Sequence, residues 1–218
     1  MAIDPKVRER NRAAQFEALG RFVEAFEDMV DEARVLCMDI ISHLGGGQAS
    51  DQNLHRIMLH IIFYHQSMTA KPIFELMRAM IGQMLNDQEF RSRRGIDHED
   101  RSVFFEILKR VNAEYQELTA IRNDLLHGNW SVGTPWDENS DDSGFFLYKP
   151  KSNKDGFVGK RDDLPQTASE LLQLSKRCED VTHWLDVICD CLPIRATLKI
   201  TECFRYTGQQ WECMRKSQ

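Results

Sequence analysis

One long stretch near the N-terminus has the periodicity of a single amphipathic helix. Between Asn11 and His43, apolar residues recur at intervals of three and four, which places them on one helical face. These residues are Phe16, Leu19, Phe22, Val23, Phe26, Met29, Val30, Ala33, Leu36 and Ile40. A helix of this length needs other elements to cover its apolar face, and we predict an all-α helical bundle.

Later parts of the chain repeat this periodicity and complete a bundle of four to five main helices. The predicted ranges are about 50–67, 72–85, 99–127 and 165–192. The first two could instead form one kinked rod around Pro72, which fits the first turn of a helix better than its interior. Gly128 is placed to end the third range, and Thr167 or Ser169 can cap the fourth.

Three segments lack the helical pattern. The polar, arginine-rich residues 88–100 are predicted to form a loop. In a turn-rich stretch further on, Phe145–Tyr148 is predicted to be a strand that pairs with residues 157–159 as a small hairpin. The predicted organisation is a bundle over residues 1–193, with this polar excursion at 130–165, and an unassigned C-terminal tail at 194–218.

The charge of the chain does not by itself indicate nucleic-acid binding, because 218 residues carry a formal net charge of −6. Two local basic clusters are interpreted as solvated loops; they consist of Lys149, Lys151, Lys154, Lys160 and Arg161, and of Arg91, Arg93 and Arg94. No apolar run approaches the roughly 20 residues that span a bilayer. The N-terminus also lacks the apolar core of a secretory signal, and we expect a cytoplasmic protein with no membrane partner.

The six cysteines fit a reducing compartment if they are free thiols. Cys37 lies on a helical apolar face and is predicted to be a small core residue. The other five lie late in the chain, near His183, and are Cys178, Cys189, Cys191, Cys203 and Cys213. The C-x-C-x11-C-x9-C spacing matches none of the usual paired zinc motifs. We therefore favour unlinked thiols over a zinc site.

Three histidines, His55, His60 and His65, recur at five-residue spacing. They raise the hypothesis of a metal-dependent nuclease or hydrolase, but no H-E-x-x-H motif or carboxylate cluster accompanies them. We interpret them as polar edges of a buried helix, with His60 and Tyr64 stacked on one face. The sequence thus predicts no metal and no cofactor.

The run Arg122-Asn123-Asp124-Leu125-Leu126-His127-Gly128 ends the predicted helix at 99–127. At about 100° per residue, with Val111 as the reference, Leu118 and Arg122 each lie within about 20° of it. Arg122 therefore falls in the middle of the apolar stripe. A charged side chain there must extend to water or meet an anionic partner, because an unpaired buried charge is very costly.

Arginine can stabilise a charged phosphate, and histidine can move a proton near neutral pH. Asn123 and His127 stack on adjacent helical turns, whereas Arg122 and His127 are about 140° apart on an ideal helix. The negative end of the helix dipole favours protonated His127. In the alternative, structural interpretation, Arg122 pairs with a glutamate of another helix, for example Glu75 or Glu32, and His127 binds the last helical carbonyls.

The pattern Arg122-Asn123-x3-His127, late in a helical bundle, resembles the R-x4-6-H signature of HEPN domains (higher eukaryotes and prokaryotes nucleotide-binding). The resemblance covers residues 10–128 and 166–193. It implies a HEPN-like bundle and a metal-independent endoribonuclease, in which Arg122 and His127 are catalytic and Asn123 supports them. The expected reaction is attack by the RNA 2′-hydroxyl, which gives a 2′,3′-cyclic phosphate.

The resemblance also implies partners and a biological setting. RNA is the expected substrate, and the expected assembly is a homodimer with a composite active site. Family members act as toxins, in anti-phage defence or in RNA processing, so an antitoxin or a defence protein is a further expected partner. Two alternatives remain open at this point: a non-catalytic helical module that binds a nucleotide or a partner protein, and a purely structural bundle.

Overall fold

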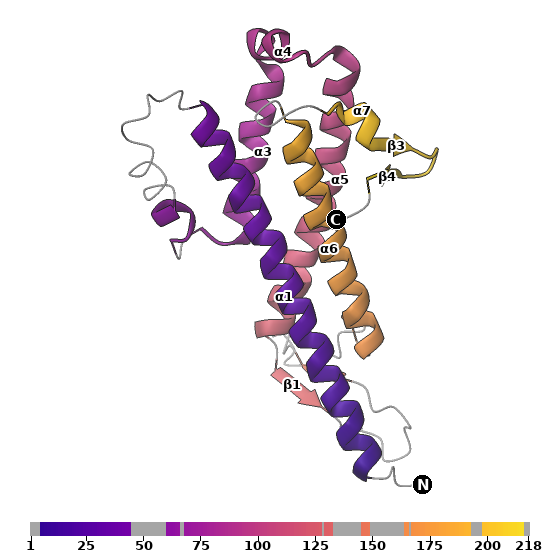
Figure 1. Ribbon diagram of the computed structural model, residues 1–218. Helices are drawn as coiled ribbons and strands as arrows, with labels where there is room; N and C mark the ends of the chain where they lie inside the picture. Colours follow the sequence, from indigo (N-terminus) through magenta and orange to yellow (C-terminus); the bar gives the residue numbers. More distant parts are fainter. Residues whose placement is uncertain are drawn as a thin grey trace, which may run out of the picture. The chain divides into compact units, whose positions relative to one another are not determined.

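The computed structural model describes residues 5–44, 60–65, 68–127, 129–132, 145–148, 164–165, 167–192 and 198–215. These residues are predominantly helical, with two small two-stranded sheets, and the predicted all-α fold is confirmed. The elements in Figure 1 are α1 (Pro5–Leu44), α3 (Ala70–Asn86), α4 (Gln88–Arg94), α5 (His98–His127), β1 (Asn129–Val132), β2 (Phe145–Tyr148), α6 (Ala168–Cys191), α7 (Ile200–Cys203), β3 (Phe204–Tyr206) and β4 (Trp211–Cys213). None of the helices described is long and apolar enough to cross a membrane.

The described residues divide into two compact units. Unit 1 draws its residues from Met1–Glu27 and Glu117–Glu179, and unit 2 from Asp28–Gln116 and Asp180–Gln218. The long helices α1, α5 and α6 therefore contribute to both units.

The apolar stripe of α1 is buried along most of its predicted length, and the helix is longer at its N-terminal end than the periodicity indicated. The buried stripe residues are Phe22, Phe26, Met29, Val30, Ala33, Leu36 and Ile40. Phe16 departs from the pattern, because it is largely exposed. The guanidinium of Arg12, one turn earlier, lies 5.6 Å from the centre of its ring, which covers part of that apolar surface.

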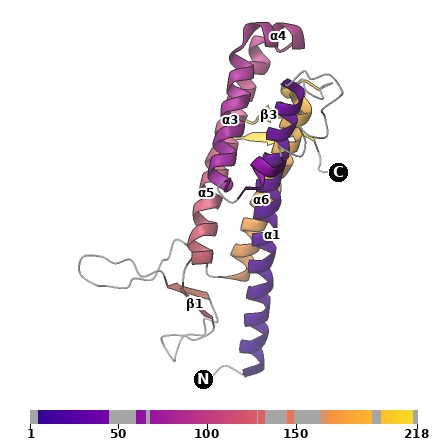
Figure 2. The same ribbon diagram turned by 90° about the vertical axis from the view of Figure 1, so that its left-hand side faces the viewer.

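The core of unit 2 joins α3 to α5; in the view of Figure 2, α3 overlaps the upper part of α5. The rings of Phe74 and Tyr115 stack with their centres 4.2 Å apart, and both side chains are fully buried. The buried hydroxyl of Tyr115 donates a hydrogen bond to the carbonyl oxygen of Ala70, at 3.1 Å. Pro72 occupies the first turn of α3, as its fixed backbone angle predicted.

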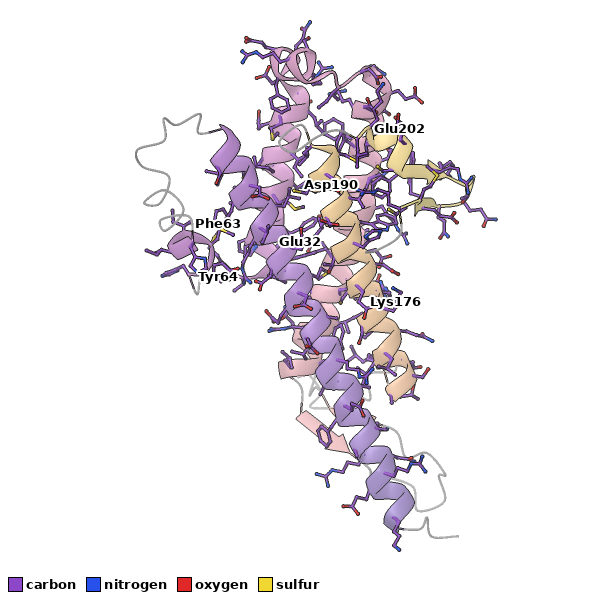
Figure 3. The ribbon with its side chains drawn as sticks, viewed as in Figure 1. Glu32, Phe63, Tyr64, Lys176, Asp190 and Glu202 are labelled. Atoms are coloured by element: carbon purple, nitrogen blue, oxygen red, sulfur yellow. The ribbon has the colours of Figure 1, made fainter. Side chains whose placement is uncertain are left out.

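Part of the predicted helix at 50–67 lies outside the described residues. Within residues 60–65, Phe63 is buried, and the predicted stacking is confirmed because the rings of His60 and Tyr64 are 4.3 Å apart. Figure 3 shows Phe63 and Tyr64 beside the part of α1 that carries Glu32. There the guanidinium of Arg34 lies 5.1 Å from the centre of the Tyr64 ring.

The prediction of a loop at residues 88–100 was wrong for the first half of this range, which forms the short helix α4. The Asp87 carboxylate caps this helix by accepting a hydrogen bond from the backbone N–H of Phe90, at 3.0 Å. Glu89 and Arg93 pair one turn apart, and Gly95 ends the helix with a φ of 69°. Phe90 is the one apolar residue of α4, so this helix has no apolar periodicity by which to recognise it.

Substitution by alanine at two glycines of unit 2 is expected to change the stability of the protein in opposite directions. Gly95→Ala is expected to destabilise the protein by about 1–2 kcal/mol, because its left-handed backbone is unfavourable for alanine. Gly82→Ala is expected to stabilise it by about 0.5–1 kcal/mol, because alanine restricts the unfolded chain within a helix. A Cβ at Gly82 would meet no atom within 4 Å. Urea unfolding of both variants measures these changes in the free energy of unfolding. If both variants were stabilised, or both destabilised, the left-handed backbone at Gly95 and the helical backbone at Gly82 could not both be correct.

The predicted strand Phe145–Tyr148 is confirmed as β2, but its partner differs. β2 pairs antiparallel with β1, Asn129–Val132, which directly follows α5. Residues 157–159, the predicted partner, lie outside the described residues. The run of apolar and aromatic residues identified the strand, whereas the choice of partner depended on a connection that carries no sequence signal.

The N-terminal end of α6 has the predicted threonine cap. The backbone N–H of Glu170 donates to Thr167 Oγ1 at 3.2 Å, and the N–H of Thr167 donates to Glu170 Oε2 at 3.0 Å. This reciprocal pair satisfies two backbone donors that the helix leaves without partners.

The C-terminal tail, which the sequence left unassigned, folds in unit 2 as α7 and the β3–β4 hairpin. Arg205 and Glu212 lie opposite each other in the two strands. Beyond the hairpin, the Arg215 guanidinium lies 2.6 Å from the carboxylate of Asp190 on α6, a residue labelled in Figure 3. The carbonyl oxygen of Arg215 lies 2.8 Å from His183 Nε2. These contacts attach the hairpin to α6.

Candidate functional site

Arg122 lies near the end of α5 and belongs to unit 1. Its neighbours one turn before and one turn after, Leu118 and Leu125, are both fully buried. The Arg122 side chain is 27% exposed. The helix therefore brings a permanently charged group to the edge of an apolar core, as the helical wheel predicted.

Two consecutive residues of α1 position the guanidinium of Arg122. Its Nη2 donates a hydrogen bond to Glu27 Oε1 at 2.9 Å, and its central carbon lies 5.5 Å from the centre of the Phe26 ring. The neighbouring Asn123 contributes only a long contact, with 3.5 Å between Nη1 and Oδ1. Nε is buried without a hydrogen-bond partner among the described residues.

The ion pair of Arg122 corrects one detail of the structural alternative. That alternative expected a glutamate of another helix, with Glu75 and Glu32 as examples; the partner is indeed a glutamate of another helix, but it is Glu27 of α1. Glu75 lies instead 3.9 Å from Lys71 on α3. Glu27 is 47% exposed, and such solvent-accessible pairs contribute about 0–1 kcal/mol to stability. The pair thus orients Arg122 and places a negative charge beside it, but it restrains the side chain only weakly.

His127 is the last residue of α5, where the predicted helix end is confirmed. Its side chain and Gly128 lie outside the described part of the structure. The structure therefore brings together Arg122, Asn123 and Glu27. The convergence of His127 on this group stays a prediction.

The cysteines are free thiols, and five of the six are buried. Burial raises the pKa of Cys37 to about 12. It raises the pKa of Cys178, which belongs to unit 1, to about 12 as well. Cys213 is less buried, and its Sγ lies 3.6 Å from His183 Nε2. Thiols with raised pKa values are poor nucleophiles and poor metal ligands at neutral pH.

The described ranges contain no group of three or more histidine, cysteine, aspartate or glutamate side chains placed to hold a metal ion. Of the two basic clusters, residues 149–161 lie outside these ranges. In the other cluster, Arg93 is paired with Glu89, which reduces its attraction for a phosphate. Arg122 is therefore the candidate anion-binding residue in this part of the chain.

Glu27 and Phe26 are the site residues that the sequence did not identify. Phe26 was assigned to the buried stripe of α1, and Glu27 was one of several acidic residues beside that stripe. Their contacts with Arg122 join positions about 95 residues apart in the chain. Such a pairing depends on how two helices align, and a single sequence has no local signal for that alignment.

The fold and the site define a helical protein with a half-buried, ion-paired arginine near the end of a long helix. No family model, no curated protein and no solved structure matches the chain.

Proposed function

We propose that the protein is a metal-independent endoribonuclease of the HEPN type. The observation that carries this proposal is the placement of Arg122, a half-buried cation oriented by Glu27 and Phe26 near the end of α5. Asn123 follows it directly, and His127 ends the same helix. The all-α fold is compatible with the bundle that the sequence motif implies.

The proposed reaction needs only groups that these residues can supply. The RNA 2′-hydroxyl gives its proton to a base, its oxygen bonds to the adjacent phosphorus, and the bond to the 5′-oxygen breaks. The 5′-oxygen then leaves as a hydroxyl after it receives a proton from an acid. Histidine serves in either proton transfer, and the guanidinium of Arg122 stabilises the negative charge that develops on the phosphoryl oxygens. The products are a 2′,3′-cyclic phosphate and a 5′-hydroxyl end.

The proposal includes a homodimer with a composite active site. Arg122 and His127 are five positions apart, about 140° around an ideal helix, so one helix presents them in different directions. Two copies of the motif that face each other would supply both groups to one RNA strand. Cellular roles as a toxin, in anti-phage defence or in RNA processing follow from the same proposal, with an antitoxin or a defence protein as a partner.

The test is cleavage of a labelled single-stranded RNA in the presence of EDTA. We expect cutting to persist in EDTA, because the chemistry needs no metal ion, and to stop when the RNA carries 2′-O-methyl groups, because these remove the nucleophile. Gel analysis of the ends should find a 2′,3′-cyclic phosphate. Cutting that EDTA abolishes, or cutting of the methylated RNA, would contradict the proposal.

The second candidate is a non-catalytic module that binds a nucleotide or a partner protein. An ordinary ion pair such as that of Arg122 with Glu27 is what the purely structural bundle expects, whereas the binding module keeps Arg122 for a ligand. On the binding-module alternative, the purified protein binds RNA or a nucleotide in a manner that depends on Arg122, but it cuts none of the RNAs tested.

A further inference from the structure

We infer that Glu27 gates Arg122. In the free protein the Glu27 carboxylate is paired with the Arg122 guanidinium, and an RNA phosphate must displace this carboxylate to bind the guanidinium fully. This inference rests on the proposed function for the identity of the ligand. It assigns to Glu27 a role that the sequence motif does not contain.

The geometry makes Glu27 the accessible partner of the pair. Its side chain is 47% exposed and that of Arg122 is 27% exposed, so a phosphate that arrives from solvent meets the carboxylate as well as the guanidinium. Glu27 Oε1 accepts the hydrogen bond of Nη2 at 2.9 Å. Nε is buried, and it cannot take part in binding without a movement of the side chain. A phosphate that binds both outer nitrogens of the guanidinium must therefore compete with Glu27 for Nη2, since Nη1 has only the long contact with Asn123.

Displacement of Glu27 costs little free energy, and it leaves the contact between Arg122 and Phe26 in place. A carboxylate that is already half in water regains full hydration with a small change of side-chain angle. Phe26 remains beneath the guanidinium, at 5.5 Å from the centre of its ring, and this contact does not involve Glu27. The open state is thus an oriented arginine with its charge available to a phosphate.

Removal of the Glu27 charge should therefore strengthen RNA binding. We expect Glu27→Gln to lower the Kd about three- to tenfold, because it weakens a competing ion pair and removes a repulsive charge from the site. The probe is a fluorescent, fully 2′-O-methylated RNA, which binds without being cut, and fluorescence anisotropy measures its Kd at fixed salt concentration.

The chain offers a matched control for the change of charge. Glu117 on α5 pairs with Arg177 on α6, also within unit 1, with 3.0 Å between carboxylate and guanidinium. Its side chain is 57% exposed, similar to Glu27. Glu117→Gln makes the same change in net charge at another ion pair, and we expect it to change the Kd less than twofold.

A double-mutant cycle with Arg122→Gln makes the test specific. The gain from Glu27→Gln should disappear when Arg122 is already replaced, because no guanidinium is left to release. A Kd for Glu27→Gln equal to or above that of Glu117→Gln, or an equal gain in the Arg122→Gln background, would overturn the gate. Circular dichroism checks folding; if Glu27→Gln is unfolded, Glu27→Asp carries the test, with a smaller decrease in Kd expected because its shorter side chain weakens the pair.

Failure of the gate and failure of the proposed function give different results. If Arg122→Ala leaves both RNA binding and RNA cleavage unchanged, the proposed function fails, and the gate fails with it. If Arg122→Ala abolishes cleavage but Glu27→Gln binds RNA no better than the wild type, only the gate fails.

Discussion

Replacement of His127 by alanine is expected to lower the rate of RNA cleavage by about 10²- to 10⁴-fold, the usual contribution of a general acid or base. Arg122→Ala is expected to lower it by about 10²- to 10³-fold, because it removes the cation that stabilises the developing phosphoryl charge. Initial rates at saturating RNA, in the presence of EDTA, measure both effects. His127 is the last residue of α5, where alanine is readily accommodated, so this variant should melt near the wild-type temperature.

Arg177→Ala is the matched control for the arginine. Arg177 also lies in unit 1, pairs with a glutamate of another helix, and is 33% exposed. Its removal changes the charge of the protein and breaks one ion pair, but it leaves the proposed catalytic groups intact. We expect a rate within about threefold of the wild type, because an exposed ion pair contributes little. A loss comparable to that of Arg122→Ala would mean that the motif has no special role.

The largest expected loss of stability comes from Tyr115 in the core of unit 2. Tyr115→Ala should destabilise the protein by about 3–5 kcal/mol, because it leaves a cavity beside the stacked ring of Phe74. Tyr115→Phe keeps that stack and removes only the hydroxyl, which donates to the carbonyl oxygen of Ala70. Its expected cost is about 0.5–1.5 kcal/mol, that of one hydrogen bond.

Urea unfolding followed by circular dichroism gives these free energies of unfolding. Tyr206→Ala is the control, because Tyr206 is largely exposed on the β3–β4 hairpin and contacts Trp211 with ring centres 5.4 Å apart. Its expected change is within about 1 kcal/mol. Similar losses for Tyr115→Ala and Tyr206→Ala would contradict the placement of Tyr115 in the core.

Most of the helical framework was predictable, because burial of one face imposes a period that a sequence displays. The stripes of α1 and α5 were identified in this way. The first-turn proline of α3 and the threonine cap of α6 were identified from the local preferences of these residue types. The helix α4 was missed because its formation depends on a cap at Asp87 and a left-handed glycine at Gly95 instead of an apolar stripe. The hairpin of the tail was missed because its strands, β3 and β4, are too short to display an alternation.

The candidate site was predictable in one respect only. The helical wheel placed Arg122 within an apolar stripe, and its half-buried position agrees. The identity of its partner, Glu27, could not follow from the sequence, because α1 carries several acidic residues and the alignment of α1 with α5 decides among them. That partner turns an isolated motif into a charge-neutral pair, and it suggests how access to the arginine is controlled.

The central claim is that Arg122 and His127 together cut RNA without a metal ion. The most direct measurement compares the wild type with the Arg122→Ala/His127→Ala double variant, purified in parallel, on one end-labelled RNA in EDTA. We expect the wild type to cut this RNA and leave 2′,3′-cyclic phosphate ends, and the folded double variant to leave it intact. Equal cutting by the two proteins, or no cutting of any RNA by the wild type, would contradict the account.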